Sequence, residues 1–568
     1  MRWYHCLPIM AVFLAVCLTA ACTAAAGQAD PVPEVPWQAY WYFARGDLLE
    51  LQGRPRQALD EYLLALKYDP RSLEPRLAAA RVMGQMGGWK EAAGILEQTV
   101  QQEPASVQAH LLLGTCYAQL RRPLEAEKSF QQVLRLDPDH IQAHKRLAAL
   151  REWQEDYARA NEHYQQLLPL VKRPENMRLR RGDNFIRMKR YRQAQKEYLQ
   201  ALEIREDLVE GHRGVARTYE LLGQSQQAVA SYRTAIERFP QQSALRRHLA
   251  ELLVRLGRPQ EALEQYRTLT SADSSDQTSL RHMALLLYHT EQYGQARDIF
   301  GRLAIVSPDD PAVHLYLGRC LAGLGEPDTA LEHFHRAVTL DRKLTEAWIS
   351  LGITHLQMDD LEGAEDVLER GVLSVSDDAR LWHLLGAAHL RLEKYQLAVG
   401  DLERARSLES ANIGILRDLA NSYEQAGYFQ KAVDVFGQLL DQRPDDHWAL
   451  NYLGYMLADA GVELPRARNL LQRALKLDPE NAYYLDSLGW VYFRLGQTDL
   501  AERYLLEAAE RSPDQAVIHD HLGDLYRQEG NIEQARERWR RALELNPGDE
   551  GIHRKLQRHQ PEDGERLP

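Results

Sequence analysis

The chain has 568 residues and a formal net charge of −12, which excludes the broad basic surface of a protein whose main partner is nucleic acid. Hydrophobic residues make up 45% and charged residues 26%, and the helix-favouring Ala, Leu, Glu, Arg and Gln are abundant. Five cysteines are too few for a disulfide framework in a chain of this length.

The first 21 residues have the pattern of a secretory signal peptide. Arg2 is followed by an apolar run, from residue 7 to about residue 21, that is short for a membrane span and ends in small side chains. The segment LTAAC, which ends at Cys22, resembles the cleavage site of bacterial lipoproteins, with Thr19 where that family favours Leu. The resemblance implies removal of residues 1–21 and lipidation of the Cys22 thiol.

Two other outcomes remain open at this end of the chain. Cleavage near Ala24 would release a free secreted protein, and no cleavage would leave the apolar run as an anchor. Several acyl chains on Cys22 would hold the protein stably on a membrane. Thr23 in place of Asp implies the outer membrane, facing the periplasm. Residues 22–38 are rich in small residues and proline, and we expect a flexible tether there.

From Ala39 onward the sequence repeats every 34 residues, which predicts stacked helix-turn-helix units. One inserted residue near Gly461 shifts the frame, and fifteen units end at residue 549. The twentieth place of every unit is alanine: Ala58, Ala92, Ala126, Ala160, Ala194, Ala228, Ala262, Ala296, Ala330, Ala364, Ala398, Ala432, Ala467, Ala501 and Ala535. The eighth place is glycine or alanine in every unit, glycine at Gly46, Gly114, Gly182, Gly318, Gly352, Gly386, Gly454, Gly489 and Gly523.

Small residues at these two places predict a close crossing of the two helices of a unit, because a large side chain would push them apart. Glycine inside a helix costs about 1 kcal/mol relative to alanine, and the close crossing offsets that cost. Large side chains recur on the second helix, and we expect them to pack on the first helix of the next unit: Tyr62, Phe130, Tyr164, Tyr198, Tyr232, Tyr266, Phe300, Phe334, Phe436 and Trp539.

Three segments depart from the repeat. Residues 550–558 predict a short helix whose polar side shields the last unit from water, and residues 559–568 predict a polar tail. Pro169 and Pro174 interrupt the junction between the fourth and fifth units, and residues 461–465 interrupt the thirteenth unit. We expect a bend at each interruption.

The repeat resembles the tetratricopeptide repeat. Residues 488–492 (LGWVY) return 34 positions later as residues 522–526 (LGDLY), and Pro513 returns as Pro547. The resemblance covers residues 39–549 and implies an all-α fold, a right-handed α-α superhelix of about fifteen units. It also implies a concave surface lined by the first helix of each unit. The last hundred residues are similar to the closing repeats of bacterial tetratricopeptide lipoproteins, which serve as adaptors in the cell envelope.

No catalytic pattern occurs in the sequence, which lacks GxxxxGK, GxSxG, HExxH and CxxC motifs. His519 and His521 resemble a metal pair by composition, but residues two apart on a helix do not share a face. Cys116 and Cys320 both occupy the tenth place of a unit, where we expect buried small side chains. We therefore expect no enzyme activity, no metal and no cofactor.

The concave places of the tetratricopeptide family, mapped onto this sequence, predict two binding zones. The first zone, in units four to eight, is cationic: Lys145, Arg146, Arg180, Arg187, Arg213, Arg217, Arg247, His248, Arg255, Arg281, His282 and His289. The second zone, in units thirteen to fifteen, is aromatic and acidic: Asn451, Tyr452, Tyr455, Tyr483, Asp486, Trp490, Phe493, Asp520, His521 and Asp524. Exposed aromatics in a groove would anchor a partner. The alternatives are a solvated face for the first zone and rings packed between units for the second.

These features favour a non-enzymatic periplasmic scaffold or adaptor, tethered to a membrane by lipidated Cys22, that binds partner proteins or peptides in its concave groove. The alternative is a component of exopolysaccharide, pilus or secretin export whose cationic groove contacts an acidic polysaccharide. We expect no nucleic acid partner. The expected location is the cell envelope, at the outer membrane facing the periplasm, with a secreted or soluble periplasmic protein as the alternative.

Overall fold

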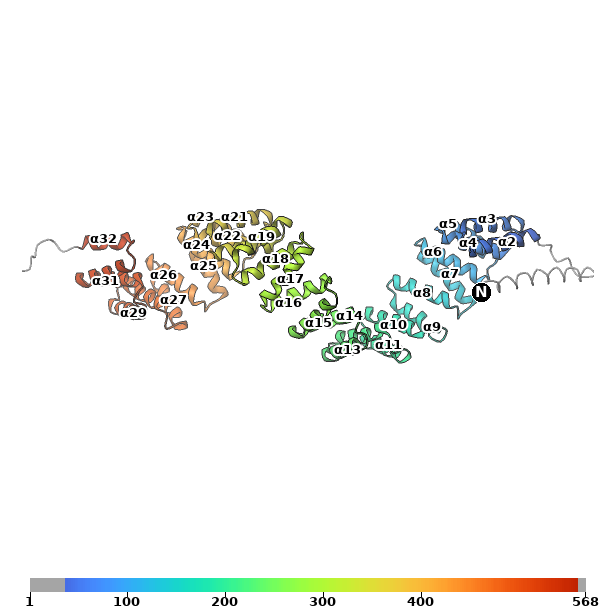
Figure 1. Cartoon of the computed structure of the whole chain (residues 1–568). Helices are drawn as coiled ribbons and strands as arrows, with labels where there is room; N and C mark the ends of the chain where they lie inside the picture. The colour runs from blue at the N-terminus through green and yellow to red at the C-terminus, as the bar shows by residue number, and fades with distance from the viewer. Residues whose placement is uncertain (1–35, 560–568) are drawn as a thin grey trace, which may run out of the picture. The chain divides into compact units, whose positions relative to one another are not determined.

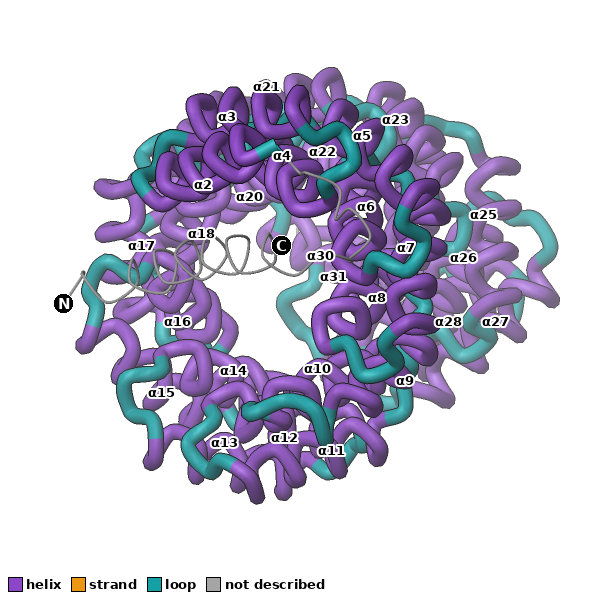
Figure 2. The backbone as a smooth tube through the Cα atoms, turned by 90° about the vertical axis from the view of Figure 1, so that its right-hand side faces the viewer, coloured by secondary structure: helices purple, strands orange, loops and turns teal. Residues whose placement is uncertain are grey.

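The computed structural model describes residues 36–559, and this part of the chain consists only of helices and connecting loops (Figure 2). Its helices form fifteen consecutive antiparallel pairs followed by one single helix. The all-α superhelix predicted from the repeat is therefore confirmed. The expected signal peptide, Cys22, most of the tether and nearly all of the polar tail lie outside the described residues.

The chain divides after Ala272 into two compact units, and Figure 1 colours their helices by residue number, from blue to red. The first unit contains seven helix pairs: α2 (Trp37–Leu51) and α3 (Pro55–Tyr68), α4 (Leu73–Gln85) and α5 (Trp89–Gln102), α6 (Val107–Gln119) and α7 (Pro123–Leu136), α8 (Ile141–Trp153) and α9 (Tyr157–Leu167), α10 (Pro174–Arg187) and α11 (Tyr191–Ile204), α12 (Val209–Leu221) and α13 (Ser225–Arg238), α14 (Ser243–Arg255) and α15 (Pro259–Ala272).

The second unit contains eight pairs and the final helix: α16 (Gln277–His289) and α17 (Tyr293–Val306), α18 (Pro311–Gly323) and α19 (Pro327–Leu340), α20 (Thr345–Gln357) and α21 (Leu361–Ser374), α22 (Ala379–Arg391) and α23 (Tyr395–Leu408), α24 (Ile413–Gln425) and α25 (Phe429–Gln442), α26 (His447–Asp459) and α27 (Leu464–Leu477), α28 (Ala482–Arg494) and α29 (Thr498–Arg511), α30 (Ala516–Gln528) and α31 (Ile532–Leu545), then α32 (Glu550–Arg558).

The two helices of each pair cross closely at the small residues. All fifteen alanines of the twentieth place are fully buried. A Cβ atom added to Gly114 would lie 2.6 Å from the Phe130 ring, which belongs to the second helix of the same pair. Phe130 thus fills the space beside a glycine of its own pair. The sequence had predicted that these large side chains pack on the next pair, and this prediction was incomplete. Tyr198 contacts both: a Cβ on Gly182 or on Gly214 of the next pair would lie 2.6 Å from its ring.

The turn inside each pair contains one residue in the left-handed region of the backbone. This residue is glycine in nine pairs and another residue in six pairs. The inserted residue near Gly461 adds one more such position, Glu463, with φ of 46° immediately before α27. At the other interruption, α9 is shortened to 11 residues and Pro169 lies in the loop before α10. Bends at these two places remain predictions.

A side-chain nitrogen at the fourth place of several pairs binds the end of the preceding pair. The Trp348 indole donates to the Arg342 carbonyl oxygen at 2.9 Å, and Nε2 of His144 lies 2.9 Å from the Pro138 carbonyl oxygen. Both contacts span six residues and satisfy a carbonyl group near a helix end. Several histidines of this chain are therefore structural.

The close crossing predicts opposite effects for two glycine substitutions in neighbouring helices. Gly114→Ala places a Cβ against Phe130, and we expect it to lower the free energy of unfolding by about 1–3 kcal/mol. Gly94→Ala in α5 meets no atom within 4 Å, and we expect it to raise the free energy of unfolding by about 1 kcal/mol, since alanine is the better helix former. Urea denaturation followed by circular dichroism measures both. Stabilisation by both substitutions would contradict the packing described here.

Candidate binding site

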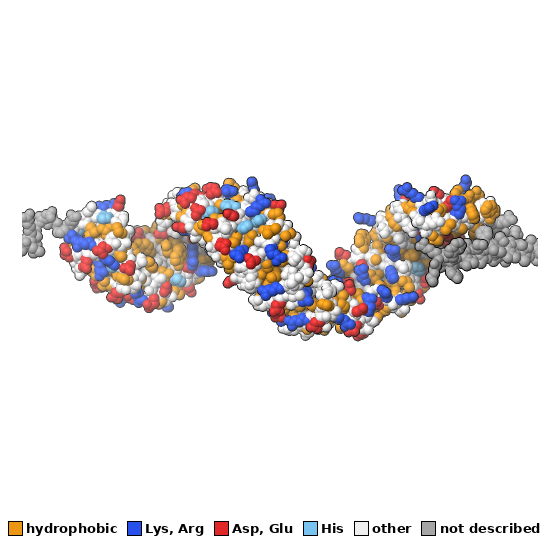
Figure 3. Space-filling view, in the orientation of Figure 1, with side chains coloured by type: hydrophobic (Ala, Val, Ile, Leu, Met, Phe, Trp, Pro, Cys, Tyr) orange, Lys and Arg blue, Asp and Glu red, His pale blue; other side chains and the backbone are white. Residues whose placement is uncertain are grey.

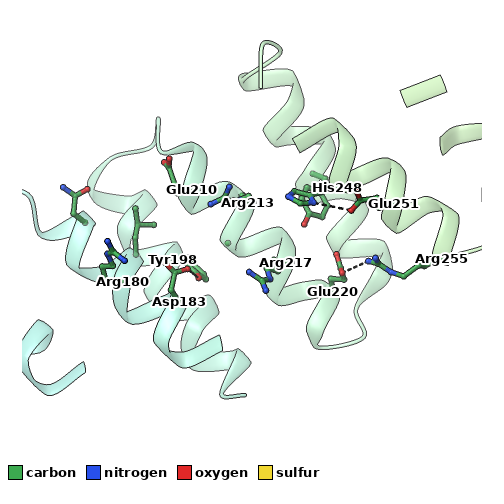
Figure 4. A pocket seen from close by; sticks show the side chains of 14 residues that line it. Arg180, Asp183, Tyr198, Glu210, Arg213, Arg217, Glu220, His248, Glu251 and Arg255 are labelled. Atoms are coloured by element: carbon green, nitrogen blue, oxygen red, sulfur yellow. Dashed lines mark hydrogen bonds and ion pairs between the residues drawn. The ribbon is translucent and has the colours of Figure 1, made fainter. Parts of the chain in front are cut away.

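A cavity of about 810 Å³ opens between the first helices of three consecutive pairs in the first unit (Figure 4). Helices α10, α12 and α14 supply its walls, and tyrosines from α11 and α13 supply part of its base. Fourteen residues line it: Asn176, Leu179, Arg180, Asp183, Tyr198, Glu210, Arg213, Gly214, Arg217, Glu220, Tyr232, His248, Glu251 and Arg255.

Helical spacing places the wall residues on one face. On α10 the successive lining residues, from Asn176 to Asp183, are three, one and three positions apart, and the same intervals recur on α12. Residues three and four apart lie on the same side of a helix. The close crossing of each pair turns this side away from the second helix. The concave places of the repeat therefore line the cavity.

Tyr198 forms a fixed part of the base. Its ring lies between Gly182 and Gly214, and its hydroxyl donates a hydrogen bond to Oδ1 of Asp183 at 2.7 Å. Burial raises the pKa of Tyr198, and the Asp183 carboxylate raises it further. The hydroxyl remains protonated, and the second carboxylate oxygen of Asp183, which is exposed, is available to a ligand.

Three arginines of the wall are free to bind a ligand. Arg180, Arg213 and Arg217 are exposed, and within residues 36–559 they make no hydrogen bond or ion pair. Arg255, by contrast, is paired with Glu220 at 2.5 Å (Figure 4). A guanidinium group presents five donors in a planar fork that matches a carboxylate, so the free arginines favour an anionic group on the ligand.

Carboxylates alternate with these arginines, so the zone predicted to be cationic carries charges of both signs in the cavity. Asp183, Glu210 and Glu251 line the same cavity, and Nδ1 of His248 lies 3.5 Å from Glu251. The acidic residues occupy the same concave places as the arginines, so the repeat register was a sufficient signal for them. The sequence-based prediction named only the cationic residues at the concave places of these pairs.

The structure brings together four of the eight arginines predicted in the cationic zone, Arg180, Arg213, Arg217 and Arg255, and His248 of the same zone lies with them. The other four do not line the cavity. Arg146 and Arg187 are exposed elsewhere on the first unit, and Arg247 is half-buried. Arg281 belongs to the second unit, where it pairs with Asp310 at 2.7 Å.

The second predicted zone is largely closed by its own side chains. Trp490 stacks on His521 with ring centroids 4.1 Å apart and on Phe493 at 4.9 Å. Each of these rings is at most 9% exposed, as is Asp486, which accepts a hydrogen bond from Nδ1 of His521 at 2.9 Å. The expectation that these residues are exposed anchors is wrong, because apolar burial between neighbouring pairs takes the rings out of solvent.

The rest of that zone is divided between packing and surface. The Tyr452 ring lies 4.4 Å from the Trp448 ring at a tilt of 34°, Tyr455 lies 6.2 Å from the His521 ring and Asn451 is buried. Lys555 of α32 binds Asp520 and Asp524 at 2.7 and 2.8 Å. Tyr483 remains 51% exposed. The sequence did not single out Lys555, because its partners lie about one repeat away, on another pair.

The adjacent histidines of α30 have separate contacts. Nε2 of His519 lies 2.9 Å from the Pro513 carbonyl oxygen, whereas His521 faces Asp486. They do not converge on a shared metal position, in agreement with their two-residue spacing.

Three sequence models for the same repeat match successive parts of this chain. A model described as tetratricopeptide repeat matches residues 186–444, a second with that description matches residues 77–141 and 463–516, and one described as TPR repeat matches residues 523–556. This chain is a tetratricopeptide-repeat protein.

Two curated relatives share parts of the tetratricopeptide array. A TPR repeat-containing protein of Pseudomonas aeruginosa is 43% identical over 72 residues, which are 13% of this chain and 12% of that protein. The human protein O-mannosyl-transferase TMTC3 is 22% identical over 357 residues, 56% of this chain and 37% of that protein. This chain thus spans only an eighth to about two fifths of the length of these relatives.

Two solved structures resemble this tetratricopeptide-repeat chain at low scores. Naa15/Naa10 bound to HypK-THB gives a TM-score of 0.37 at 13% identity, covering 92% of this chain and 96% of that one. Yeast Tom70 gives a TM-score of 0.29 at 17% identity, covering 67% and 93%. The fold assignment therefore relies on the helix pairs and the sequence models.

A buried histidine in the second unit of this tetratricopeptide-repeat protein faces carboxylates on both sides. His389 Nδ1 lies 2.6 Å from Asp401, and Nε2 lies 3.0 Å from Glu365, which also binds Lys394 at 2.6 Å. Glu365, Glu369 and His389 are close enough to share a metal ion. Both ring nitrogens, however, are positioned as donors, and this arrangement fits a protonated imidazole better than a metal ligand. Burial alone would lower the pKa of His389, but Asp401 and Glu365 outweigh it and raise the pKa.

The raised pKa predicts a pH-dependent contribution of His389 to stability. The unfolded imidazole has a pKa of about 6.5, so the stabilisation is fully present below that pH and is lost as pH rises through the higher folded value. We expect His389→Gln to lower the melting temperature of the wild type more at about pH 6 than at about pH 9. Thermal denaturation at both pH values measures this, and an equal loss at both would show that His389 is neutral in the folded protein.

Proposed function

We propose that this chain is a non-enzymatic scaffold that holds an extended segment of a partner protein in the cavity between α10, α12 and α14. The observation that carries this proposal is the set of three free arginines, Arg180, Arg213 and Arg217, above a base that contains Tyr198. The cavity volume of about 810 Å³ falls in the range of ligand pockets in general, about 300–1,000 Å³.

The alternating charges favour a protein segment over an acidic polysaccharide. A polymer with the same negative charge on every residue would place carboxylates against Asp183, Glu210 and Glu251 as well as against the arginines. A peptide also offers backbone N–H groups, which the carboxylates would accept, and acidic side chains, which the arginines would bind. The export-assembly alternative relied on a uniformly cationic groove, and the cavity does not provide one.

The proposal includes a location in the cell envelope. The LTAAC segment before residue 23 supports lipidation of Cys22, and a lipid anchor would raise the local concentration of the scaffold at the membrane. In the described part of the chain, no helix has the length and apolarity that crossing a bilayer requires.

Substitution of the free arginines tests the binding cavity. We expect Arg213→Ala and Arg217→Ala each to weaken binding of a synthetic Glu-rich peptide by about tenfold, because each removes a charge-assisted hydrogen bond. Isothermal titration with the purified chain measures the affinity. The matched control is Arg192→Ala, which removes an exposed arginine of α11 that does not line the cavity.

Two results would contradict this assignment. The first is an unchanged peptide affinity in both cavity variants. The second is binding of alginate, an acidic polysaccharide, that exceeds binding of the peptide and is lost in the same variants. A capture experiment from envelope extract, comparing the wild type with the Arg213→Ala, Arg217→Ala double variant, would then identify which partner proteins depend on the cavity.

Metabolic labelling tests the proposed anchor. We expect radiolabelled palmitate to be incorporated into the wild type and incorporation to be abolished by Cys22→Ala, since the Cys22 thiol is the proposed acceptor. Cys116 and Cys320 are buried, so Cys116→Ala serves as the control that keeps incorporation. Labelling that persists after Cys22→Ala would remove the lipid anchor from the proposal.

A further inference from the structure

The first helix of the array presents a stripe of large apolar side chains to solvent. Trp37, Tyr40, Trp41, Leu48 and Leu51 are between 51% and 87% exposed. They recur at helical intervals of three, four and seven residues along α2 and so lie on one side of it. In Figure 3 hydrophobic side chains are visible at the end of the first unit that carries α2.

In later pairs the corresponding side is covered by the preceding pair. Trp41 and Leu48 occupy the third and tenth places, where α6 has Ala109 and Cys116, which are 0% and 3% exposed. Helix α6 packs there against α5, the second helix of the pair before it. The other side of α2 holds the buried Ala39 and Gly46, which face the second helix of the pair. Helix α2 is therefore apolar on two sides, and the described structure covers only one.

The opposite terminus of the repeat array has its own cover. Helix α32 packs on α31, buries Ile552 and exposes the polar side chains of His553, Arg554, Gln557 and Arg558. Terminal repeats with a polar outer face keep such arrays soluble. The first pair instead carries tryptophan, tyrosine and leucine on its outer side, so another apolar surface is expected to cover it.

The segment immediately before α2 is a poor cover by sequence. Residues 22–35 contain Pro31 and Pro33, no apolar helical period and mostly small side chains. This segment does, however, limit where α2 can be. Cys22 and Pro36 are fourteen positions apart, and a chain of that length spans at most about 50 Å even when fully extended, so a lipid on Cys22 would keep α2 within that distance of the bilayer.

We propose that the apolar stripe of α2 lies against the surface of a lipid bilayer. This inference builds on the membrane location in the proposed function. Tryptophan and tyrosine are the residues most enriched at membrane–water interfaces, and Trp37, Tyr40 and Trp41 stand at the end of α2 nearest the tether. Leu48 and Leu51 continue the apolar side, so α2 lies in the plane of the interface along its length.

Apolar burial, and not charge, drives this contact. Arg45, the cation beside the stripe, is paired with Glu61 at 3.1 Å, and Glu50 accepts a hydrogen bond from Arg81. No cluster of free cations accompanies the stripe on α2, so the contact does not require anionic lipid. Salt should leave it nearly unchanged.

An environment-sensitive fluorophore on α2 tests the contact in the full chain. Leu48→Cys is labelled with NBD, and the protein is bound to vesicles of phosphatidylethanolamine and phosphatidylglycerol that contain doxyl-labelled lipid. We expect NBD at position 48 to shift its emission to the blue and to lose about half of its intensity through quenching by the lipid. NBD on Leu124→Cys, an exposed position of α7, should do neither.

Substitution of the aromatic residues supplies the second measurement. Trp37→Ser with Trp41→Ser should abolish lipid quenching at position 48, whereas Leu124→Ser with Trp153→Ser, which changes two exposed apolar residues elsewhere in the first unit, should not. All four side chains are at least half exposed, so the fold should survive each pair of changes.

Two outcomes overturn the inference. A blue shift at position 48 without lipid quenching would mean that protein covers the stripe, either a second copy of the chain or its own first 35 residues, and sedimentation velocity would separate the two. If NBD at position 48 emits as it does in water, the apolar stripe of α2 is covered by neither lipid nor protein. Palmitate labelling is read independently, so loss of the lipid anchor and loss of the α2 contact are distinguishable.

Discussion

The close crossing of two helices at a glycine or alanine is the constraint on which this structure depends. The twentieth-place alanines are completely buried, and rings such as Phe130 and Trp539 occupy the space that a side chain at Gly114 and Gly523 would need. Because the ring fills the space left by the absent side chain, each first helix is held at a fixed distance from its second helix. The outward side of the first helix is thereby kept free of intrapair packing, and in α10, α12 and α14 this side lines the cavity.

Tyr198 shows how packing and recognition are joined. Its ring is held between Gly182 and Gly214 of successive pairs, and its hydroxyl orients Asp183 in the cavity. The arginines around it are held only by their helices. A guanidinium group is costly to bury without a partner, so Arg213 and Arg217 remain in solvent, where a ligand can reach them. The base of the cavity is thus fixed by packing, whereas the charged side chains of its walls are exposed to solvent.

At the second predicted zone the concave side chains are buried, whereas the arginines of the first zone are exposed. Trp490 and His521 occupy the same kind of concave places as Arg217 and His248, but large apolar rings gain free energy when they leave water. They therefore stack on each other, and Lys555 of α32 neutralises Asp520 and Asp524. Aromatic rings in a concave register indicate a binding surface only where neighbouring pairs leave room between them.

The sequence by itself determined the repeat. A period of 34 residues, alanine at one place and glycine or alanine at another were enough to predict the helix pairs and their close crossing, because both depend on neighbours within one unit. The register also predicted that Arg180, Arg213 and Arg217 share one surface. Only the tertiary structure decided which concave side chains stay exposed, since the burial of each one depends on the size and charge of the side chains that the next pair places beside it. It likewise decided that Trp41 and Leu48 of α2 have no cover among the described residues. Places that are identical in the repeat differ in exposure because, within residues 36–559, the first pair has no preceding pair to pack against.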